Sequence, residues 1–409
     1  MEQAENRAPL AGVKVLELAR ILAGPWAGQI FADLGAEVIK VESPHGDDTR
    51  GWGPPFIEGL DEDKPTAAYF HCCNRGKQSI AIDFGDPRGQ EIIRKLAAEA
   101  DILIENFKVG GLKKYGLDYE SLKAVNPGLV YCSVTGFGQD GPYAQRAGYD
   151  FMIQGMGGIM DLTGAPDGEP MKVGVAFADI FTGLYGVIGV LAALRHRDAT
   201  GEGQHVDMSL LDAQVGVLAN QALNYLASGK APTRMGNSHP NIVPYQVFPA
   251  SDGHLIIAVG SDAQFVKLCA ILGTDPLATD PAFATNAARV KNRDALVEQL
   301  AEKTATFTRD DLLAKLAAAH VPAGPINSVS DVFDDPQVIH RGMRVDLPAA
   351  DGSSTVPGVR TPITLSETPL SYRHAAPTLG ADTNSVLESL GYGADEIAAL
   401  NADGIIGKR

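Results

Sequence analysis

Short apolar runs alternate with longer segments of helical spacing along the first part of the chain. The runs predict strands at residues 13–18, 37–42, 101–106 and 129–134. Between them, apolar residues that recur every three or four positions predict helices at residues 26–34, 88–98 and 119–125. Strands that alternate with helices are typical of an α/β fold with a doubly wound, mostly parallel, Rossmann-like sheet.

The longest apolar run, residues 180–194, predicts one buried helix. It is too short to span a bilayer, and it contains Thr182 and three glycines. Gly183, Gly186 and Gly189 recur every third residue and would let another backbone approach closely. We therefore expect this helix to pack tightly in the core.

A second unit follows a segment without periodicity. Residues 228–240 are rich in Pro, Gly, Ser and Asn, and they mark the passage into that unit. Beyond them the pattern predicts a strand at 254–259, helices at 264–272, 293–304 and 309–318, a short element at 345–347 and a last helix at 384–390. We divide the chain into a large domain begun by residues 1–225, a smaller α/β domain at 226–327, and a return to the large domain at 328–409.

Composition limits the classes of partner. The formal net charge is −16 and the isoelectric point is near 5.0, which argues against nucleic-acid or anionic-membrane partners. Four cysteines without a CxxC pair suggest neither a metal site nor a disulfide framework. The amino terminus has acidic residues and no apolar stretch typical of a signal peptide, so we expect a cytoplasmic protein.

Asp179 is the most informative single residue, because it stands where a short apolar run meets the glycine-spaced helix. A carboxylate among small and apolar residues is partly desolvated, and it can act as a nucleophile toward an activated acyl group. Asp is also a preferred helix N-cap, and Asp179 could simply cap the helix that follows it. Taken alone, the residue leaves both interpretations open.

A dinucleotide cofactor is disfavoured by the turns between strands and helices. The first turn, residues 19–25, has no GxGxxG. Residues 155–158 are glycine-rich, but no acidic residue follows them at the expected place after a second strand. A nicotinamide oxidoreductase is therefore a weak alternative.

Several segments, in order along nearly the whole chain, match one enzyme family. They are residues 10–18 with 23–25, 34–42, 74–79, 105–107, 148–150, and 178–179 followed by 182–183. On these segments the chain resembles the class III CoA-transferases. The resemblance implies an interlocked homodimer and no tightly bound cofactor, with coenzyme A and acyl-CoA as substrates.

The resemblance also implies a mechanism and a set of site residues. Asp179 stands at the position of the catalytic aspartate, which attacks an acyl-CoA thioester and passes through a mixed anhydride and an aspartyl-CoA thioester. Backbone N–H groups near Leu22 and Ala23 are candidates to stabilise the oxyanion. The other positions expected at the CoA site are Asn74, Arg75, Lys77, Asn106, Phe107, Lys114, Tyr149 and Asp150.

Some of these positions have a second interpretation. Lys113 and Lys114 could be a solvated helix face, and Asp150 could be a helix cap or a second carboxylate that faces Asp179. Ser43 replaces an arginine of some relatives, and Ala147 replaces a lysine. The chain therefore lacks these two cations of the expected CoA site.

Two further segments look most like the members that exchange CoA between succinate and glutarate. They are residues 46–50 with 52–56, and His239 with 242–246. They favour succinyl-CoA as donor and a glutarate-like dicarboxylate as acceptor. Arg50 could grip the far carboxylate, or it could pair with Asp47 or Asp48 as a loop staple. His239 is a candidate at the acyl pocket, or a hydrogen-bonding strut.

Two alternatives come from other functional classes. The racemases of the same family pair an aspartate with a histidine, but this chain has Tyr149 where the histidine belongs, and tyrosine is a weak base near neutral pH. A non-catalytic acyl-CoA-binding protein would keep the basic positions without needing Asp179. The expected partners are therefore an acyl-CoA and a carboxylic acid.

Overall fold

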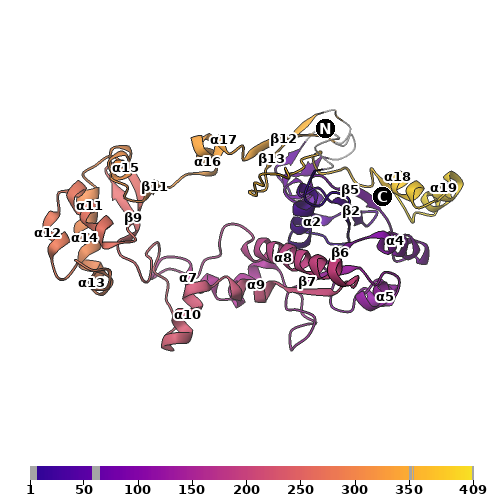
Figure 1. Ribbon diagram of the computed structural model, residues 1–409, viewed down its shortest axis with the longest axis horizontal. Helices are drawn as coiled ribbons and strands as arrows, with labels where there is room; N and C mark the ends of the chain where they lie inside the picture. Colours follow the sequence, from indigo (N-terminus) through magenta and orange to yellow (C-terminus); the bar gives the residue numbers. More distant parts are fainter. Residues whose placement is uncertain (1–6, 58–64, 350–351, 353, 408–409) are drawn as a thin grey trace. The chain divides into compact units, whose positions relative to one another are not determined.

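The computed structural model describes residues 7–57, 65–349, 352 and 354–407, and the chain divides into two compact units (Figure 1). The large unit comprises Met1–Ile159, Lys172–Leu226 and Gln337–Arg409, and the small unit comprises Met160–Met171 and Ala227–Pro336. The small unit therefore includes a short earlier segment and extends beyond the predicted boundary at 327. Residues 1–6, which bear on the signal-peptide expectation, lie outside the described part.

The large unit contains a sheet of six parallel strands. These are β1 (Lys14–Glu17), β2 (Glu37–Glu42), β5 (Gln78–Ala81), β6 (Ile102–Glu105), β7 (Val130–Thr135) and β8 (His205–Ser209). Their order in the sheet is β5-β2-β1-β6-β7-β8. Counted along the chain this is the 3-2-1-4-5-6 order of doubly wound sheets, and it reverses between β1 and β6. The predicted fold class is confirmed.

Two strands of this sheet, β5 and β8, were not among the predicted elements. Polar residues interrupt their apolar pattern, Gln78 and Ser79 in β5 and His205 and Asp207 in β8. Ser79 is nevertheless buried, because its hydroxyl donates to Glu42 Oε1 at 2.7 Å. A buried polar residue with a partner in a neighbouring strand cannot be recognised from hydrophobic periodicity.

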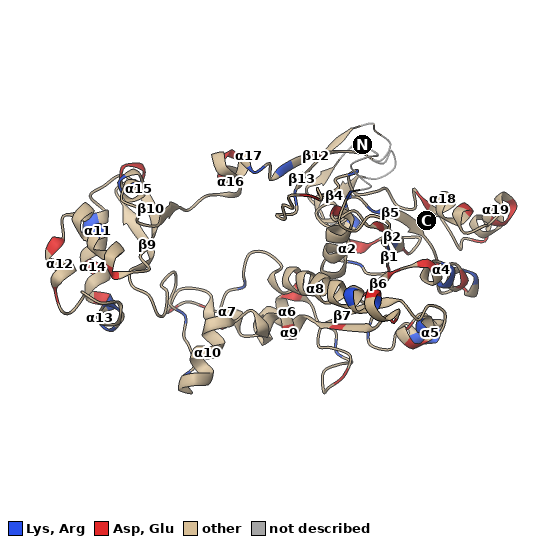
Figure 2. Ribbon diagram, in the orientation of Figure 1, with Lys and Arg blue, Asp and Glu red and all other residues tan. Residues whose placement is uncertain are grey.

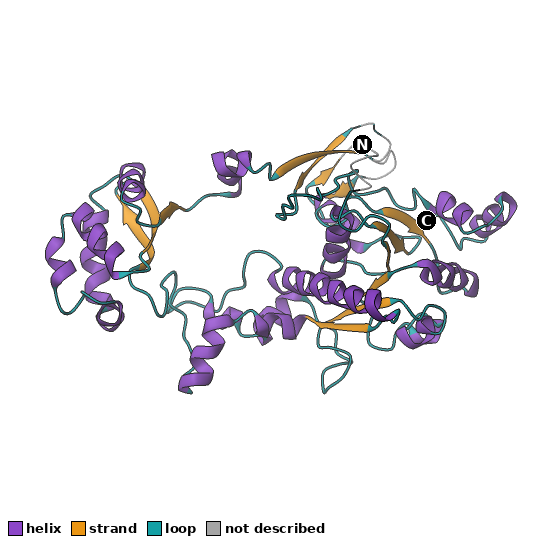
Figure 3. Ribbon diagram, in the orientation of Figure 1, coloured by secondary structure: helices purple, strands orange, loops and turns teal. Residues whose placement is uncertain are grey.

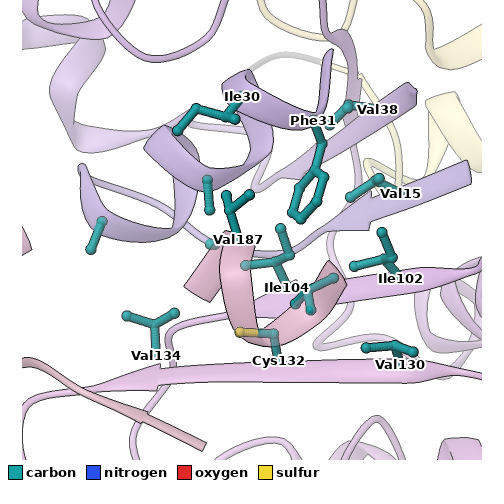
Figure 4. Close-up of a cluster of buried hydrophobic side chains, with 14 of the residues drawn as sticks. Val15, Ile30, Phe31, Val38, Ile102, Ile104, Val130, Cys132, Val134 and Val187 are labelled. Atoms are coloured by element: carbon teal, nitrogen blue, oxygen red, sulfur yellow. The ribbon is translucent and has the colours of Figure 1, made fainter. Parts of the chain in front are cut away.

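Helices cover both faces of the sheet (Figures 1 and 3). One face packs against α2 (Ala23–Asp33) and α8 (Phe177–Thr200). The other packs against α4 (Pro87–Glu99), α5 (Tyr119–Lys123), α18 (Thr383–Ser389) and α19 (Ala394–Ala402). Figure 4 shows the first of these cores, where Phe31 of α2 and Val187 of α8 meet strand residues such as Val15, Ile104 and Cys132. Acidic and basic residues are interspersed along α4 (Figure 2).

The shorter elements complete the chain. In the large unit they are η1 (Asp48–Gly51), β3 (Phe56–Ile57), β4 (Thr66–Ala67), α3 (Ala68–His71), η2 (Lys113–Tyr115), α6 (Asp150–Met156), α9 (Leu210–Gly216), β12 (Arg344–Pro348) and β13 (Thr355–Val359). Three helices cross the unit boundaries along the chain, namely α7 (Ile159–Leu162), α10 (Ala219–Ser228) and α17 (Pro336–His340). The prediction that the chain's last helix is at 384–390 was wrong, because α19 follows α18 and buries Ile397 and Leu400.

The small unit joins a three-stranded antiparallel sheet to a group of helices. Its strands are β9 (Tyr245–Ala250), β10 (Gly253–Ala258) and β11 (Ala323–Pro325), in the order β11-β10-β9. Its helices are α11 (Asp262–Leu272), α12 (Asp275–Thr279), α13 (Asn286–Lys291), α14 (Arg293–Thr304), α15 (Arg309–Ala318) and α16 (Val329–Asp334). The predicted bounds of α14 and α15 are confirmed, because each repeats buried leucines at helical spacing.

Helix α8 differs from its prediction at both ends. It begins at Phe177, so Asp179 lies inside the first turn and is not the N-cap, which is Ala176. It is also 24 residues long, so the prediction that it is too short to span a membrane was wrong: by length and composition alone it could. Core helices of soluble proteins meet the same criterion. One face of α8 packs against the sheet and buries Val187 and Val190.

Gly183 provides the close backbone approach that the glycine spacing predicted. A Cβ at position 183 would lie 2.7 Å from the carbonyl oxygen of Ala23 in α2, whereas a Cβ at position 186 would meet nothing nearer than 3.8 Å. We expect Gly183→Ala to lower the free energy of unfolding by about 1–3 kcal/mol, since backbone must move. Gly186→Ala, the matched control, should be neutral or stabilising because Ala favours helix. Thermal melting of both variants checks this, and equal melting temperatures would contradict it.

Candidate active site

A cavity of about 680 Å³ opens at the carboxyl ends of the parallel strands. Its wall includes residues 20–23 after β1, 106–109 after β6, 82–85 after β5 and 134–136 at the end of β7. The cavity therefore lies at the point where the strand order reverses, which is where open α/β sheets bind ligands. Asp179 of α8 is part of the same wall.

Asp179 is partly buried and close to a second carboxylate. Burial, and after it the charge of Asp150, raises the pKa of Asp179 to about 7. Asp150 Oδ1 accepts the backbone N–H of Ala178 at 2.8 Å and that of Asp179 at 3.4 Å. Asp150, which lies in α6, thus caps α8 and also faces Asp179. Both interpretations of Asp150, as a helix cap and as a second carboxylate, therefore apply. Gln154 Nε2 donates to the other oxygen of Asp150 at 2.8 Å and orients it.

The turn between β1 and α2 forms another part of the cavity wall. Leu22 and Ala23 line the cavity, and Leu22 is the N-cap of α2 without a side-chain hydrogen bond to cap the helix. Within the described chain, the N–H groups of Leu22, Ala23 and Gly24 have no hydrogen-bond acceptor. The close contact of Gly183 with Ala23 joins the helix that carries Asp179 to this turn.

The arrangement can support acyl transfer. A carboxylate with a pKa near neutrality is more nucleophilic than an ordinary surface carboxylate, and it is still ionised in mildly alkaline solution. Unpaired N–H groups at the start of a helix favour a developing negative charge. The cavity is also large enough for an extended ligand.

Comparison with known proteins identifies the family. The sequence model of CoA-transferase family III matches residues 10–383. The chain belongs to CoA-transferase family III. It is therefore an enzyme that transfers CoA, and CoA thioesters are its substrates.

Individual relatives support the same assignment. The transferase is 56% identical to a succinate–glutarate CoA-transferase of Agrobacterium fabrum, over 94% of this chain and 96% of the relative. It is 42% identical to the succinyl-CoA:glutarate CoA-transferase of Mus musculus, over 98% of this chain and 91% of that protein. Among solved structures, a CAIB/BAIF family protein from Brucella suis superposes with a TM-score of 0.84 at 63% identity, covering 94% of this chain and 100% of the other.

Most of the site residues predicted from the sequence line the cavity of the transferase. Besides Asp179 they are Leu22, Ala23, Asn106, Phe107, Lys114, Tyr149 and Asp150. Ser43 and Ala147, the two departures from relatives, also lie on its wall. The predicted set is thus largely brought together, although its contacts with CoA stay predictions.

Asn74, Arg75 and Lys77 are not brought to the cavity wall of the transferase. Arg75 forms a buried two-point ion pair with Asp33, with N–O distances of 2.9 and 2.6 Å. Lys77 Nζ lies 2.8 Å from Glu17 and donates to Asn74 Oδ1 at 2.9 Å. Buried cations require such partners. The geometry gives all three side chains structural contacts, and none of their polar groups faces the cavity.

Arg50 is also engaged elsewhere. Its guanidinium donates to both oxygens of Glu42 at 2.8 and 2.7 Å and lies 3.8 Å from the centre of the Phe70 ring. Arg50 therefore forms a structural ion pair, as the second interpretation predicted, but its partner is Glu42 and not Asp47 or Asp48. Arg50 is absent from the lining of the described cavity, and its role toward a substrate stays a prediction.

His239 lies in the small unit. Its Nδ1 accepts the backbone N–H of Asn241 at 3.1 Å, and its ring packs on Tyr245 with centroids 5.1 Å apart. Burial, and after it the charge of Arg293, lowers the pKa of His239. These contacts fit a hydrogen-bonding strut, and its place at the acyl pocket stays a prediction.

Two arginines of the transferase's cavity wall were missed by the sequence analysis. Arg146 stacks on Tyr143 at 4.5 Å and on Phe137 at 5.4 Å, and Arg20 pairs with Asp48 at 3.1 Å near the surface. Arg146 immediately precedes Ala147, so the lysine missing at 147 was a signal to search the neighbouring position for a cation. Nothing in the local sequence marked Arg20.

Tyr69 is a further residue that the sequence did not single out. Burial, and after it the charge of Asp179, raises the pKa of the Tyr69 phenol, which places Tyr69 within electrostatic reach of Asp179. Its ring packs edge-on against Trp52, a cavity residue, with centroids 5.4 Å apart. Its hydroxyl therefore stays protonated and can donate a hydrogen bond near the site.

Proposed function

We propose that the enzyme transfers CoA from succinyl-CoA to glutarate or a similar dicarboxylate, with Asp179 as the covalent nucleophile. The observation that carries this proposal is the position of Asp179, a partly buried carboxylate with a raised pKa on the wall of the large cavity. The substrates are suggested by relatives that are named for succinate, succinyl-CoA and glutarate at 56% and 42% identity.

The proposed reaction proceeds by carboxylate chemistry without a net proton transfer. An oxygen of Asp179 attacks the thioester carbon, the C–S bond breaks, and CoA leaves as a thiolate from a mixed anhydride. The thiolate then attacks the aspartyl carbon of that anhydride, which releases the donor as a carboxylate and leaves an aspartyl-CoA thioester. The acceptor carboxylate repeats these steps in reverse, so the new acyl-CoA leaves and Asp179 is restored.

The chain's own residues would assist each step. The unpaired N–H groups of Leu22 to Gly24 are suited to stabilise the tetrahedral oxyanion. Asp150 would keep Asp179 reactive by raising its pKa, and it would hold the first turn of α8 in place. Cations of the cavity wall, Lys108, Lys114 and Arg146, are suited to bind the phosphates of CoA.

A pair of neighbouring lysines tests the CoA site. Lys114 and Lys113 are both exposed in η2, but Lys114 lines the large cavity and Lys113 lines a smaller one of about 190 Å³. We expect Lys114→Ala to raise the KM for succinyl-CoA roughly 3–10-fold at nearly unchanged kcat, since it removes one charged contact made throughout the reaction. Lys113→Ala is the matched control. Steady-state kinetics check this, and equal KM values for the two variants would count against phosphate binding by Lys114.

We also propose that the enzyme is a homodimer. Large apolar side chains of the large unit are exposed on three helices, and they include Phe151 of α6, Ile188 of α8 and Leu223 and Leu226 of α10. A second copy of the chain would cover such surfaces, and the family resemblance favours an interlocked pair. Light scattering should give a mass of about twice 43.1 kDa. The acidic net charge fits a cytoplasmic enzyme whose partners are small molecules.

A mass-spectrometric screen tests the function directly. The purified protein is incubated with succinyl-CoA or acetyl-CoA and with a panel of acids that includes glutarate, mesaconate and oxalate. We expect glutaryl-CoA and free succinate as the most rapidly formed products. Faster transfer to another acid would replace the acceptor but keep the mechanism. If no new thioester formed with any pair, the transferase proposal would be refuted.

A further inference from the structure

The turn between β1 and α2 adopts an unfavourable backbone conformation on the wall of the cavity that Asp179 also lines. Ile21 has a φ of +73°, in the left-handed region that costs a β-branched residue about 1–2 kcal/mol. Ile21 and the residues on either side of it line the large cavity. Such a conformation persists only where surrounding contacts impose it.

Two side chains from distant parts of the sequence hold this turn. The amide of Asn106, just after β6, spans the backbone of Arg20: Oδ1 accepts the Arg20 N–H at 3.0 Å, and Nδ2 donates to the Arg20 carbonyl at 2.6 Å. The carboxylate of Asp47 accepts the N–H of Ile21, with the shorter distance 3.2 Å to Oδ2. Both contacts join residues far apart in the sequence.

Buried charges keep Asp47 in place. Lys40 Nζ lies 3.1 Å from Asp47 Oδ2 and donates to the carbonyl of Ala19, at the start of the turn, at 2.8 Å. Thr49 donates to Asp47 Oδ1 through both its N–H and its hydroxyl. Burial alone would raise the pKa of Asp47, but Lys40 and Thr49 more than offset it, so the carboxylate is ionised. Asp47 is therefore a rigid acceptor.

Backbone atoms on the two sides of the turn differ in their hydrogen bonding. The carbonyl of Ala19, both polar backbone atoms of Arg20 and the N–H of Ile21 have partners. The N–H groups of Leu22, Ala23 and Gly24 have no acceptor within the described chain. The hydrogen bonds of Ala19 to Ile21 thus fix the backbone that precedes the unpaired N–H groups of Leu22 to Gly24.

We propose that Asp47 and Asn106 are positioning residues, which hold the Arg20–Ile21 turn so that the N–H groups of Leu22 and Ala23 face the oxyanion formed beside Asp179. The inference rests on the proposed transferase mechanism. It assigns Asn106, expected from the resemblance at the CoA site, to the backbone of the enzyme. It also explains why an unfavourable conformation is kept at the wall of the cavity.

The first test separates the turn from the chemistry. Amide hydrogen exchange of residues 19–26 is measured without substrate in Asp47→Asn, Asn106→Ala and the control Asp33→Asn. Asp33 is a buried carboxylate at the other end of α2 and is paired with Arg75. Its replacement therefore removes a buried ionic contact, as Asp47→Asn does, but at a position far from the turn. We expect exchange in the turn to increase at least about tenfold in the first two variants only. Unchanged exchange in both would overturn the proposal.

The second test is kinetic. Loss of oriented oxyanion donors is expected to lower kcat about 10–100-fold in Asp47→Asn and Asn106→Ala, with the KM for succinyl-CoA within about threefold of the parent. Faster exchange with unchanged kcat would overturn the positioning role, and so would an equal loss of kcat in Asp33→Asn. Asn106 is only partly buried, so Asn106→Ala can still be measured if Asp47→Asn fails to fold.

A rescue experiment adds a readout that general destabilisation would not give. Gly adopts positive φ freely and Ala does not, while both remove the Ile21 side chain. In the Asp47→Asn background, we expect Ile21→Gly to have at least about fivefold higher kcat than Ile21→Ala. Equal kcat values would contradict the proposal. If the parent enzyme formed no acyl-CoA from any donor, the transferase mechanism would fail, and hydrogen exchange would still decide whether the two residues hold the turn.

Discussion

Replacing Asp179 by Ala or Asn is expected to reduce formation of glutaryl-CoA from succinyl-CoA and glutarate by at least about 10⁴-fold, because the variant lacks the carboxylate that forms the anhydride in the proposed mechanism. Mass spectrometry of the products measures the loss, and intact-protein mass spectra should lose any CoA adduct formed by the parent. Asp48→Asn is the matched control. Asp48 also lines the cavity, but it pairs with Arg20 at the exposed rim. Activity retained in Asp179→Ala would overturn the nucleophile assignment.

The stability of the Asp179→Asn variant tests whether misfolding causes its loss of activity. The folded protein holds the pKa of Asp179 near 7, above the ordinary carboxyl value of 3.8, so the folded state binds more protons than the unfolded state between these pH values. This carboxyl therefore makes folding less favourable as pH rises from about 4 to 7. We expect Asp179→Asn to melt at or above the temperature of the parent at pH 8. A clearly lower melting temperature would indicate structural damage instead.

The dependence of activity on pH is the prediction with the next largest effect. In the proposed mechanism only the ionised form of Asp179 attacks, so kcat/KM should rise tenfold per pH unit below an apparent pKa of about 7 and level off above it. At pH 5 the rate is expected to be about 100-fold below the plateau. Initial rates from pH 5 to 9 in constant ionic strength measure the profile. A flat profile above pH 5 would contradict the raised pKa.

Two variants assign this pH dependence to its physical cause. Asn at position 150 can still accept the N–H of Ala178, so Asp150→Asn removes charge while keeping the cap of α8. Because the charge of Asp150 raises the pKa of Asp179, the profile should shift toward lower pH. Glu105 is a second carboxyl whose pKa burial raises to about 7, and it accepts the N–H of Phe107 at 2.7 Å. Glu105→Gln should leave the midpoint in place, and a shift there would assign the profile to Glu105.

Elements whose stability is local were predicted well from the sequence. Helices α14 and α15 have the predicted bounds, because their buried leucines recur at helical spacing within one segment. Strand β2 also agrees with its prediction, since its apolar run is continuous enough to be recognised. Strand β5 was missed because Ser79 is buried through a partner, Glu42, that lies elsewhere in the chain.

The first turn of α8 shows why the local pattern was insufficient near the site. Asp is a good N-cap, so the sequence alone could not decide whether Asp179 capped the helix or reacted. The structure shows that the capping carboxylate is that of Asp150, 29 residues earlier in the sequence. With its cap supplied from α6, α8 begins before Asp179 and leaves that side chain free of the capping role.

Periodicity and ordered motifs were sufficient to predict the fold class, the family and the exceptional position of Asp179, and most of the site residues predicted from them lie on the cavity wall. Which cations face the cavity depends instead on contacts between distant parts of the chain. Arg75, Lys77 and Arg50 pair with Asp33, Glu17 and Glu42, while Arg146 lies on the wall. The sequence around a cationic residue does not reveal its partner, because the partner can be a carboxylate far away in the sequence. A buried cation needs such a partner, and only folding brings the two together.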